Sequence, residues 1–288
     1  MKHRAEDLVP LALINMGQAP VGVRAGCSAK IRSLYPSFHR AEQHVADFVL
    51  RDPETALRLT SRELARECGT SEATVVRFSQ NLGYQGLPEF RTSLMQDVLS
   101  AQRGLYEEVT ADDAPADLLR KVVNLSVSAL HDTLAVLDPG EFGRAVEAVI
   151  NARRLHFFGA GGSAYIAQEA ALKFLRLSVP AVSFIDRFSQ VTSAALLGAG
   201  DVALGLSYTG VTKEVVEALT TARQTGATTI CITNFDRSPI TQAADIKLLT
   251  AATPTLLAGE SGQSRVAQLA IIDALGAAVA LHRNRTHG

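Results

Sequence analysis

The sequence predicts an α+β protein of two domains, an all-α N-terminal domain followed by a doubly wound α/β domain with a five-stranded parallel sheet in the order 2-1-3-4-5. Three observations predict this class. The 288 residues, of which 47% are hydrophobic, exceed one typical domain. Between residues 38 and 99, apolar side chains recur with a helical period. Beyond residue 154, short apolar runs alternate with helical stretches, which is typical of a parallel sheet.

The first segment, residues 1–29, is expected to be an extension outside the folded domains. It has a weak likeness to a secretory signal, but Glu6, Asp7 and Arg24 interrupt its pattern. No apolar run in the chain approaches the roughly 20 residues that a membrane helix needs. The three cysteines share no disulfide or metal-binding spacing, which suits a reducing compartment. We therefore expect a cytoplasmic protein without a membrane span.

Residues 30–103 carry the start and stop signals of a helix-turn-helix. Thr60 and Glu63 form a capping-box pattern that opens a short helix. Gly69 permits the left-handed turn that ends this helix, and Ser71 can cap the next one. The second helix keeps its apolar residues near one face up to Gly83. Two short helices joined by such a turn are typical of a DNA-binding unit.

The N-terminus and outer face of the second helix carry the candidate DNA-binding residues Ser71, Glu72, Ala73, Thr74 and Arg77. Small side chains let the backbone approach the major groove, and an arginine can pair bidentately with guanine. The alternative is an ordinary helical hairpin in which Arg77 only faces solvent. The net charge does not distinguish these two interpretations. Residues 30–103 contain 10 Lys and Arg and 9 Asp and Glu, a net charge of +1, whereas DNA-binding domains usually carry a basic surface.

An acidic stretch without an apolar period, residues 104–117, predicts a linker, and the second domain then spans residues 118–288. Two amphipathic helices, about 118–137 and 141–152, open this domain, and a helix of about 263–282 closes it. The runs expected to form buried parallel strands are 155–158, 181–185, 202–206, 228–232 and 245–249.

Two glycine-containing loops follow strands that are neighbours in the predicted order. Open α/β sheets bind ligands where the strand order reverses, which here lies between the first and third strands. Each loop combines glycines with hydroxyl groups at a helix N-terminus, and this combination suits a phosphate monoester. The candidate ligand-binding residues are Gly161, Gly162 and Ser163 after the first strand, and Ser207, Tyr208, Thr209, Gly210 and Thr212 after the third.

Two other interpretations of these loops stay open. Gly159, Gly161 and Ala164 fit a loose dinucleotide-binding pattern, with Asp186 in the place of a ribose partner. Alternatively, the hydroxyl groups of the second loop only cap the helix that follows at Thr212.

Two parts of the chain resemble the RpiR family of bacterial transcriptional regulators. The helix-turn-helix likeness rests on residues 59–65, 68–78, 82–86 and 89–90. Residues 118–281 resemble the SIS, or sugar isomerase, domain of the same family, on the strength of residues 161–163, 207–212, 232–234, 260–261 and 265–269. Thr70, Gln85 and Thr209 depart from the usual pattern. Gln85 stands where a lysine is common and removes one phosphate contact, whereas Thr209 keeps the hydroxyl of the usual serine.

The resemblance implies a DNA-binding transcriptional regulator of carbohydrate metabolism whose SIS domain binds a phosphorylated sugar or sugar acid as effector. Glu260 joins the candidate ligand-binding residues, and no cofactor, metal or enzyme activity is implied. The implied partners are double-stranded operator DNA and a phosphosugar. Half-sites one helical turn apart require a symmetric protein, so we expect a homodimer or homotetramer.

The main alternative is a phosphosugar isomerase with an appended helical module, and a less favoured one is a nicotinamide-dependent enzyme. An isomerase needs a base to move a proton between neighbouring carbons. Glu260 and His156 are the candidates, and His156 lies in an apolar run that favours a buried histidine with satisfied hydrogen bonds.

Overall fold

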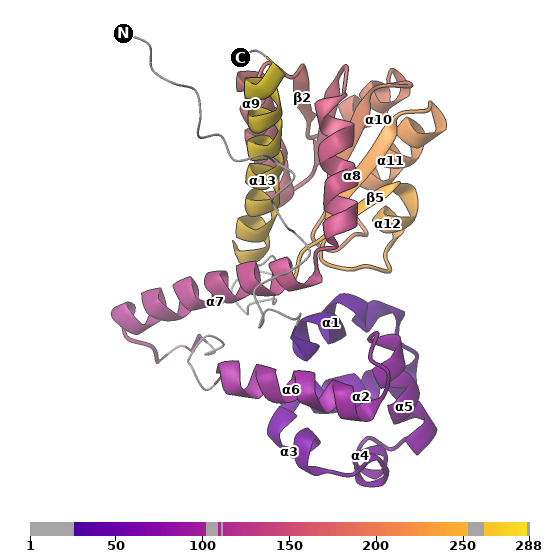
Figure 1. The fold of residues 1–288 in the computed structure, drawn as a ribbon, viewed down its shortest axis with the longest axis vertical. Helices are drawn as coiled ribbons and strands as arrows, with labels where there is room; N and C mark the ends of the chain where they lie inside the picture. Colours follow the sequence, from indigo (N-terminus) through magenta and orange to yellow (C-terminus); the bar gives the residue numbers. More distant parts are fainter. Residues whose placement is uncertain (1–25, 102–108, 111, 253–261, 287–288) are drawn as a thin grey trace.

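The computed structural model describes residues 26–101, 109–110, 112–252 and 262–286. In Figure 1 the chain forms a helical domain and an α/β domain, and the long helix α7 runs crosswise between them. The helices of the first domain are α1 (Cys27–Leu34), the 3-10 helix η2 (Tyr35–Ser37), α2 (Arg40–Arg51), α3 (Pro53–Arg58), α4 (Ser61–Glu67), α5 (Glu72–Asn81) and α6 (Leu87–Ala101).

The helix-turn-helix signals act as the sequence predicts. The hydroxyl of Thr60 accepts a hydrogen bond from the backbone N–H of Glu63 at 3.3 Å, and the Glu63 carboxylate accepts one from the backbone N–H of Thr60 at 2.8 Å. Gly69 ends α4 with φ of 61°, a conformation that glycine adopts without the penalty of a Cβ atom. Ser71 then caps α5. Phe78 and Phe90 bind α5 to α6 in the core of the domain.

The helical domain begins before residue 30, where the sequence analysis placed its start. Helix α1 opens at Cys27, and Cys27, Ala29 and Ile31 are buried in the helical domain. Its first turn is held by Asp97 of α6, whose carboxylate accepts a hydrogen bond from the backbone N–H of Ser28 at 2.7 Å. The apolar residues of α1 span too short a segment to show a helical period. The sequence therefore predicted that residues 27–29 belong to the N-terminal extension.

The expected linker, residues 104–117, ends earlier than the sequence predicts, because residues 115–117 belong to a helix. Helix α7 (Pro115–Val136) begins with proline at its first position, and Asp117 lies in its first turn. Both are favourable there, because proline lacks an N–H that would be unpaired anyway and an acid complements the helix dipole. Residues 104–108 and 111 of the expected linker lie outside the described residues.

The second domain has the predicted topology, a five-stranded parallel sheet in the order β2-β1-β3-β4-β5. Its strands are β1 (Leu155–Gly159), β2 (Ala181–Phe184), β3 (Val202–Leu206), β4 (Thr228–Thr233) and β5 (Ile246–Leu249). Each differs from its expected range by at most one residue at either end. The two central strands, β1 and β3, are buried along their whole length. This explains their nearly continuous apolar sequence.

Helices cover both faces of the sheet (Figure 1). One face packs on α8 (Pro139–Ile150), α9 (Gly162–Arg176) and α13 (Gly262–Thr286), and the other on α10 (Arg187–Ala195), α11 (Lys213–Gln224) and α12 (Pro239–Ala243). Successive strand residues alternate between the two cores, with Phe157 in the first and Phe158 in the second. The domain is therefore doubly wound, as the sequence predicts.

The expectation that no segment is apolar and long enough to span a membrane is wrong for helix α13. By length and composition alone, Gly262–Asn284 is long and apolar enough to cross a membrane. Ile272 and Leu275 are instead buried against the sheet, and the helix also contacts α7, α8 and α9. Its apolar character is explained by packing within the domain.

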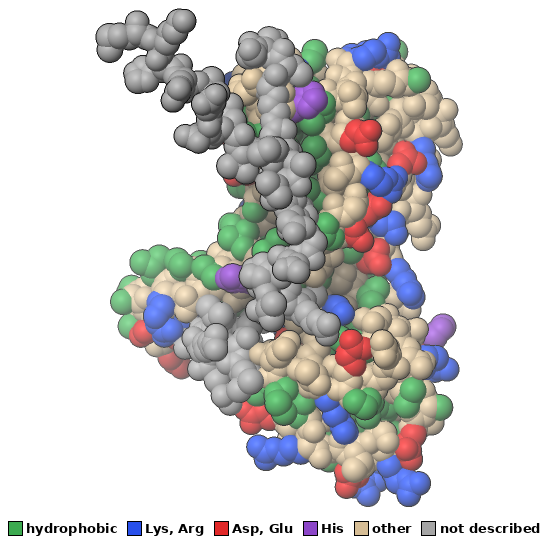
Figure 2. All heavy atoms as spheres, viewed as in Figure 1, with side chains coloured by type: hydrophobic (Ala, Val, Ile, Leu, Met, Phe, Trp, Pro, Cys, Tyr) green, Lys and Arg blue, Asp and Glu red, His purple; other side chains and the backbone are tan. Residues whose placement is uncertain are grey.

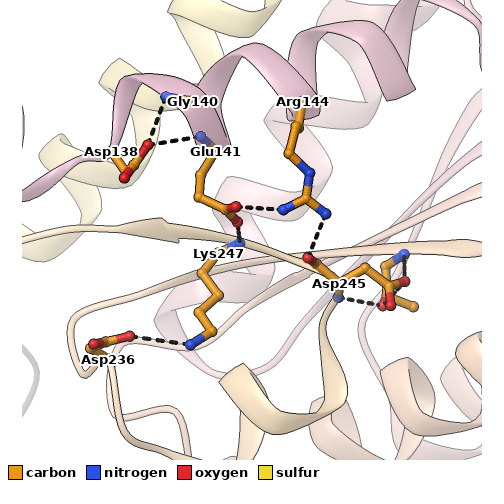
Figure 3. Close-up of polar contacts among 8 residues, drawn as sticks. Asp138, Gly140, Glu141, Arg144, Asp236, Asp245 and Lys247 are labelled. Carbon is orange, nitrogen blue, oxygen red and sulfur yellow. Dashed lines mark hydrogen bonds and ion pairs between the residues drawn. The ribbon is translucent and has the colours of Figure 1, made fainter.

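The free edge of the sheet, at β5, is covered by side chains from α8 (Figure 3). Glu141 accepts a hydrogen bond from the backbone N–H of Lys247 at 2.9 Å and also pairs with Arg144. Arg144 in turn donates to the backbone carbonyl of Asp245 at 3.0 Å. The Lys247 side chain pairs with Asp236 at 3.4 Å. Edge strands expose unpaired backbone groups that can pair with other chains. Here the contacts from α8 occupy two such groups, the N–H of Lys247 and the carbonyl of Asp245.

We expect Glu141→Ala to lower the free energy of unfolding by about 1–3 kcal/mol, because it removes a charged acceptor from the β5 backbone and the partner of Arg144. Urea denaturation of the full chain measures the change. Glu147→Ala is the matched control, since Glu147 is an exposed carboxylate on the same helix, and its expected effect is within about 0.5 kcal/mol. Equal stability of the two variants would contradict a role for Glu141 at the sheet edge.

Candidate functional site

The candidate DNA-binding residues lie on the first half of α5, but their side chains face different ways. Ser71 and Thr74 face each other, with the two hydroxyl oxygens 2.9 Å apart, and Thr74 is buried. Ala73 is exposed. Thr74 therefore helps to cap the helix, whereas Ala73 lies on the surface that a DNA duplex would meet.

Glu72 joins the two helices of the helix-turn-helix. Its carboxylate accepts hydrogen bonds from the Arg62 guanidinium at 3.0 Å and from the Ser61 hydroxyl at 3.1 Å, both on α4. These two contacts lower the pKa of Glu72. The carboxylate therefore sets the position of the α5 N-terminus relative to α4.

Arg77 is held by a buried carboxylate of α2. Its Nε atom donates to Glu42 at 3.2 Å, and the side-chain amide of Asn81, one turn later, donates to the same oxygen at 2.8 Å. The other oxygen of Glu42 accepts from the backbone N–H of His39 at 3.1 Å. The Glu42 side chain is 1% exposed and the Arg77 side chain 56% exposed. Arg77 is thus fixed at its inner edge and open to solvent beyond it.

Three further arginines of the helical domain are exposed beside this helix and were not singled out from the sequence. Figure 2 shows Lys and Arg side chains along the lower edge of the domain, where α3, α4 and α5 lie in Figure 1. Arg58, Arg62 and Arg66 have side chains at least 76% exposed. The spacing of Arg62 and Arg66, four residues apart on one helix, is the sequence signal that could have identified them.

The two candidate ligand loops lie side by side at the carboxyl edge of the sheet. Strands β1 and β3 pair in parallel, with Gly159 opposite Leu206 at their ends. The first loop enters α9, and the second enters α11. These helices cover opposite faces of the sheet, so their N-termini converge on the edge between them. The pairing therefore places the loops that carry Ser163 and Ser207 next to each other at this edge of the sheet.

Hydrogen bonds within the second loop hold its shape. The hydroxyls of Ser207 and Thr212 lie 2.7 Å apart, and Ser207 also accepts from the backbone N–H of Gly210 at 3.0 Å. Gly210 has φ of 69°, and a Cβ atom there would lie 2.3 Å from the hydroxyl of Ser238. Only glycine fits this position. Thr212 makes no side-chain cap to α11, so the interpretation that it caps this helix is wrong.

The other candidate ligand residues differ in exposure. Thr209 is exposed, whereas Tyr208 is half-buried and donates to the carbonyl of Ala252 at 3.3 Å. Burial raises the pKa of Tyr208 to about 12, so its hydroxyl stays protonated. Gly161 and Gly162 form the turn into α9, where Ser163 lies in the first helical turn. Glu260 lies outside the described residues.

A buried residue beside Ser163 was not among the candidates. Gln268 of α13 is fully buried, and its Oε1 lies 3.4 Å from the Ser163 hydroxyl, while its Nε2 has no hydrogen-bond partner. Gln268 lies within residues 265–269, which carry part of the SIS resemblance, but nothing in the sequence assigned it a contact with the first loop. Only the packing of α13 against α9 brings it to the first loop.

Two of the residues that the enzyme alternatives require, His156 and Asp186, have other contacts. His156 is buried, with its Nδ1 atom 2.9 Å from the Ser193 hydroxyl, and burial lowers its pKa. It is therefore a neutral buried histidine near pH 7, as its apolar context predicts. Asp186 caps α10 by accepting from the backbone N–H of Ser189 at 2.9 Å.

The two domains define the chain as a helix-turn-helix regulator with a SIS domain. The family model for the helix-turn-helix domain of the rpiR family matches residues 25–101, and that for the SIS domain matches residues 148–278. The chain belongs to the RpiR family of transcriptional regulators, as the resemblance indicated.

Individual relatives agree with this assignment. An HTH-type transcriptional regulator of Caldanaerobacter subterraneus is 38% identical over 247 residues, which cover 86% of this chain and 88% of that protein. The HTH-type transcriptional regulator HexR of Pseudomonas aeruginosa is 33% identical over 88% of this chain and 89% of its own. Among solved structures, Vibrio vulnificus NanR complexed with ManNAc-6P is similar over 90% of this chain and 93% of its own, with 27% identity and a TM-score of 0.56.

We expect Arg77→Ala to weaken binding to a duplex that the protein selects from random-sequence DNA by about 1–3 kcal/mol, with relaxed preference at one base pair. Fluorescence anisotropy with the selected duplex and its single-base variants measures both. Arg77→Lys keeps the charge but loses bidentate pairing, so it should relax the same preference. If Arg77→Ala weakens selected and random duplexes equally, the residue contacts phosphate and does not read a base.

Proposed function

We propose that this regulator binds operator DNA through α5 and that a phosphorylated sugar or sugar acid, bound between the loops after β1 and β3, changes its DNA affinity. The main supporting observation is the pairing of β1 with β3, which brings Ser163, Ser207 and two helix N-termini to one edge of the sheet. Helix N-termini and hydroxyl groups together favour a phosphate. NanR, which is similar along nearly its whole length, is complexed with a phosphosugar, ManNAc-6P.

A regulator without enzyme activity suits this site better than an isomerase. His156, one of the two candidate bases, is buried and bonded to Ser193, so it is not available to a ligand at the loops. Conversion of hexose 6-phosphates, followed by NMR in the presence of the full chain, distinguishes the two functions. Isomerisation at a rate above that of a heat-denatured sample would overturn this part of the proposal.

The proposed regulator is a cytoplasmic homodimer or homotetramer. Large apolar side chains are exposed along α7, where Figure 2 shows a band of hydrophobic atoms. They include Leu119 at 67%, Val123 at 51% and Leu134 at 64% exposed. A band of this kind on a soluble protein is typical of an interface, and a two-fold interface would pair two helix-turn-helix units for two half-sites.

We expect Ser163→Ala and Ser207→Ala each to weaken the best ligand of a hexose 6-phosphate panel at least tenfold, because each removes a hydrogen bond to a charged group worth about 1.5–3 kcal/mol. Isothermal titration calorimetry measures the affinity, and melting temperatures test the fold. Thr220→Ala is the control, since Thr220 is exposed on α11 and its hydroxyl donates to the backbone carbonyl of Val216. Unchanged affinity in both loop variants would mean that the phosphate does not bind there.

The effector and DNA must influence each other equally if one conformational equilibrium couples the domains. We expect a saturating phosphosugar to change the affinity for the selected duplex by about 5–150-fold, and the duplex to change the phosphosugar affinity by the same factor. Anisotropy titrations with and without the phosphosugar, and calorimetry with and without the duplex, measure the two factors. DNA affinity that is unchanged at saturation would overturn the sensor function while leaving DNA binding intact.

A further inference from the structure

We propose that Gln268 is a ligand-binding residue, which donates a hydrogen bond from its Nε2 to the phosphate group held by the turn after β1. This inference rests on the proposed function, since it assigns one more contact to the same effector. It assigns to the site a residue on α13, the C-terminal helix, in addition to the two loops.

The polar contacts of Gln268 are incomplete. Its side chain is fully buried, yet Nε2 has no hydrogen-bond partner among the residues that the structure describes, and Oε1 makes a long contact of 3.4 Å with the Ser163 hydroxyl. A buried donor without a partner costs free energy, and such groups in folded proteins usually have a partner or a function. Interchanging the two amide atoms leaves the other one unpartnered, so either orientation retains an unused polar group.

The location of Gln268 indicates what the partner is. The two amide atoms are bonded to one carbon, so Nε2 lies next to the atom that contacts Ser163. Ser163 is in the first turn of α9, where backbone N–H groups and the helix dipole favour an anion. A phosphate bound there would present acceptor oxygens, and these select the amide orientation in which the NH₂ group faces the ligand.

A second buried amide on the other side of the turn provides a contrast. Gln190 of α10 donates its Nε2 to the carbonyl of Gly159 at 2.9 Å, and its unpartnered atom is the acceptor Oε1. An acceptor cannot bond to an ionised phosphate oxygen. Gln190 therefore positions the turn, and Gln268 is the glutamine whose free group matches phosphate.

The test is Gln268→Met in the full chain, a change that keeps the volume and removes the amide. We expect affinity for inorganic phosphate, and for the best ligand of the hexose 6-phosphate panel, to fall about tenfold or more, as for the loss of one bond to a charged group. The melting temperature without ligand should stay the same or rise, because an unpaired buried donor is gone. Gln242→Met, on the exposed surface of α12, is the control and should change neither quantity.

Gln268→Glu separates the proposed donor role from an acceptor role. A carboxylate repels phosphate, so this variant should lose phosphate binding altogether. Wild-type phosphate affinity in Gln268→Met, or retained affinity in Gln268→Glu, would overturn the assignment of Gln268 while leaving the loop site intact. A lower melting temperature of Gln268→Met with unchanged affinity would overturn it in favour of a packing role. If the wild-type chain binds neither inorganic phosphate nor any phosphosugar, the proposed function itself fails.

Discussion

The parallel pairing of β1 with β3 determines the geometry of the proposed effector site. The chain leaves β1 toward one face of the sheet and leaves β3 toward the other, so α9 and α11 diverge while their N-termini stay together. This pair lies inside the sheet, with β2 on one side of it and β4 on the other. The site is consequently built from backbone N–H groups and short hydroxyl side chains, which rigid strands and helices hold in place.

The two loops differ in how much of their hydrogen bonding is already satisfied. In the second loop, Ser207, Gly210 and Thr212 bond to one another, which pre-organises the loop without a ligand. At the first turn, Gln190 and Gln268 each leave one buried amide atom without a partner. In the proposed site, a pre-formed loop would reduce the entropy cost of binding, and an anion would give the Nε2 donor of Gln268 a partner.

Two acidic side chains make the polar contacts that hold helix α5, the proposed DNA-binding helix, against its neighbours. Glu72 fixes the start of α5 against α4, and buried Glu42 fixes Arg77 and Asn81 one turn further along. These ion pairs explain why the domain has nearly balanced charge and still presents arginines on its surface. The contact with buried Glu42 reduces the number of orientations that the Arg77 side chain can adopt.

The two domains, the capping and turn residues of the helix-turn-helix, and the order and approximate ends of the strands could all be predicted from the amino-acid sequence. These features depend on local periodicity and on contacts between residues a few positions apart, such as Thr60 with Glu63. Short apolar segments such as Cys27 to Ile31 carried too little periodicity to be recognised. The contacts between buried polar groups, in contrast, could be identified from the folded chain alone. Glu42 reaches Arg77, and Gln268 reaches Ser163, across 35 and 105 positions of the chain. Such contacts arise from helix packing and leave no pattern in a single sequence.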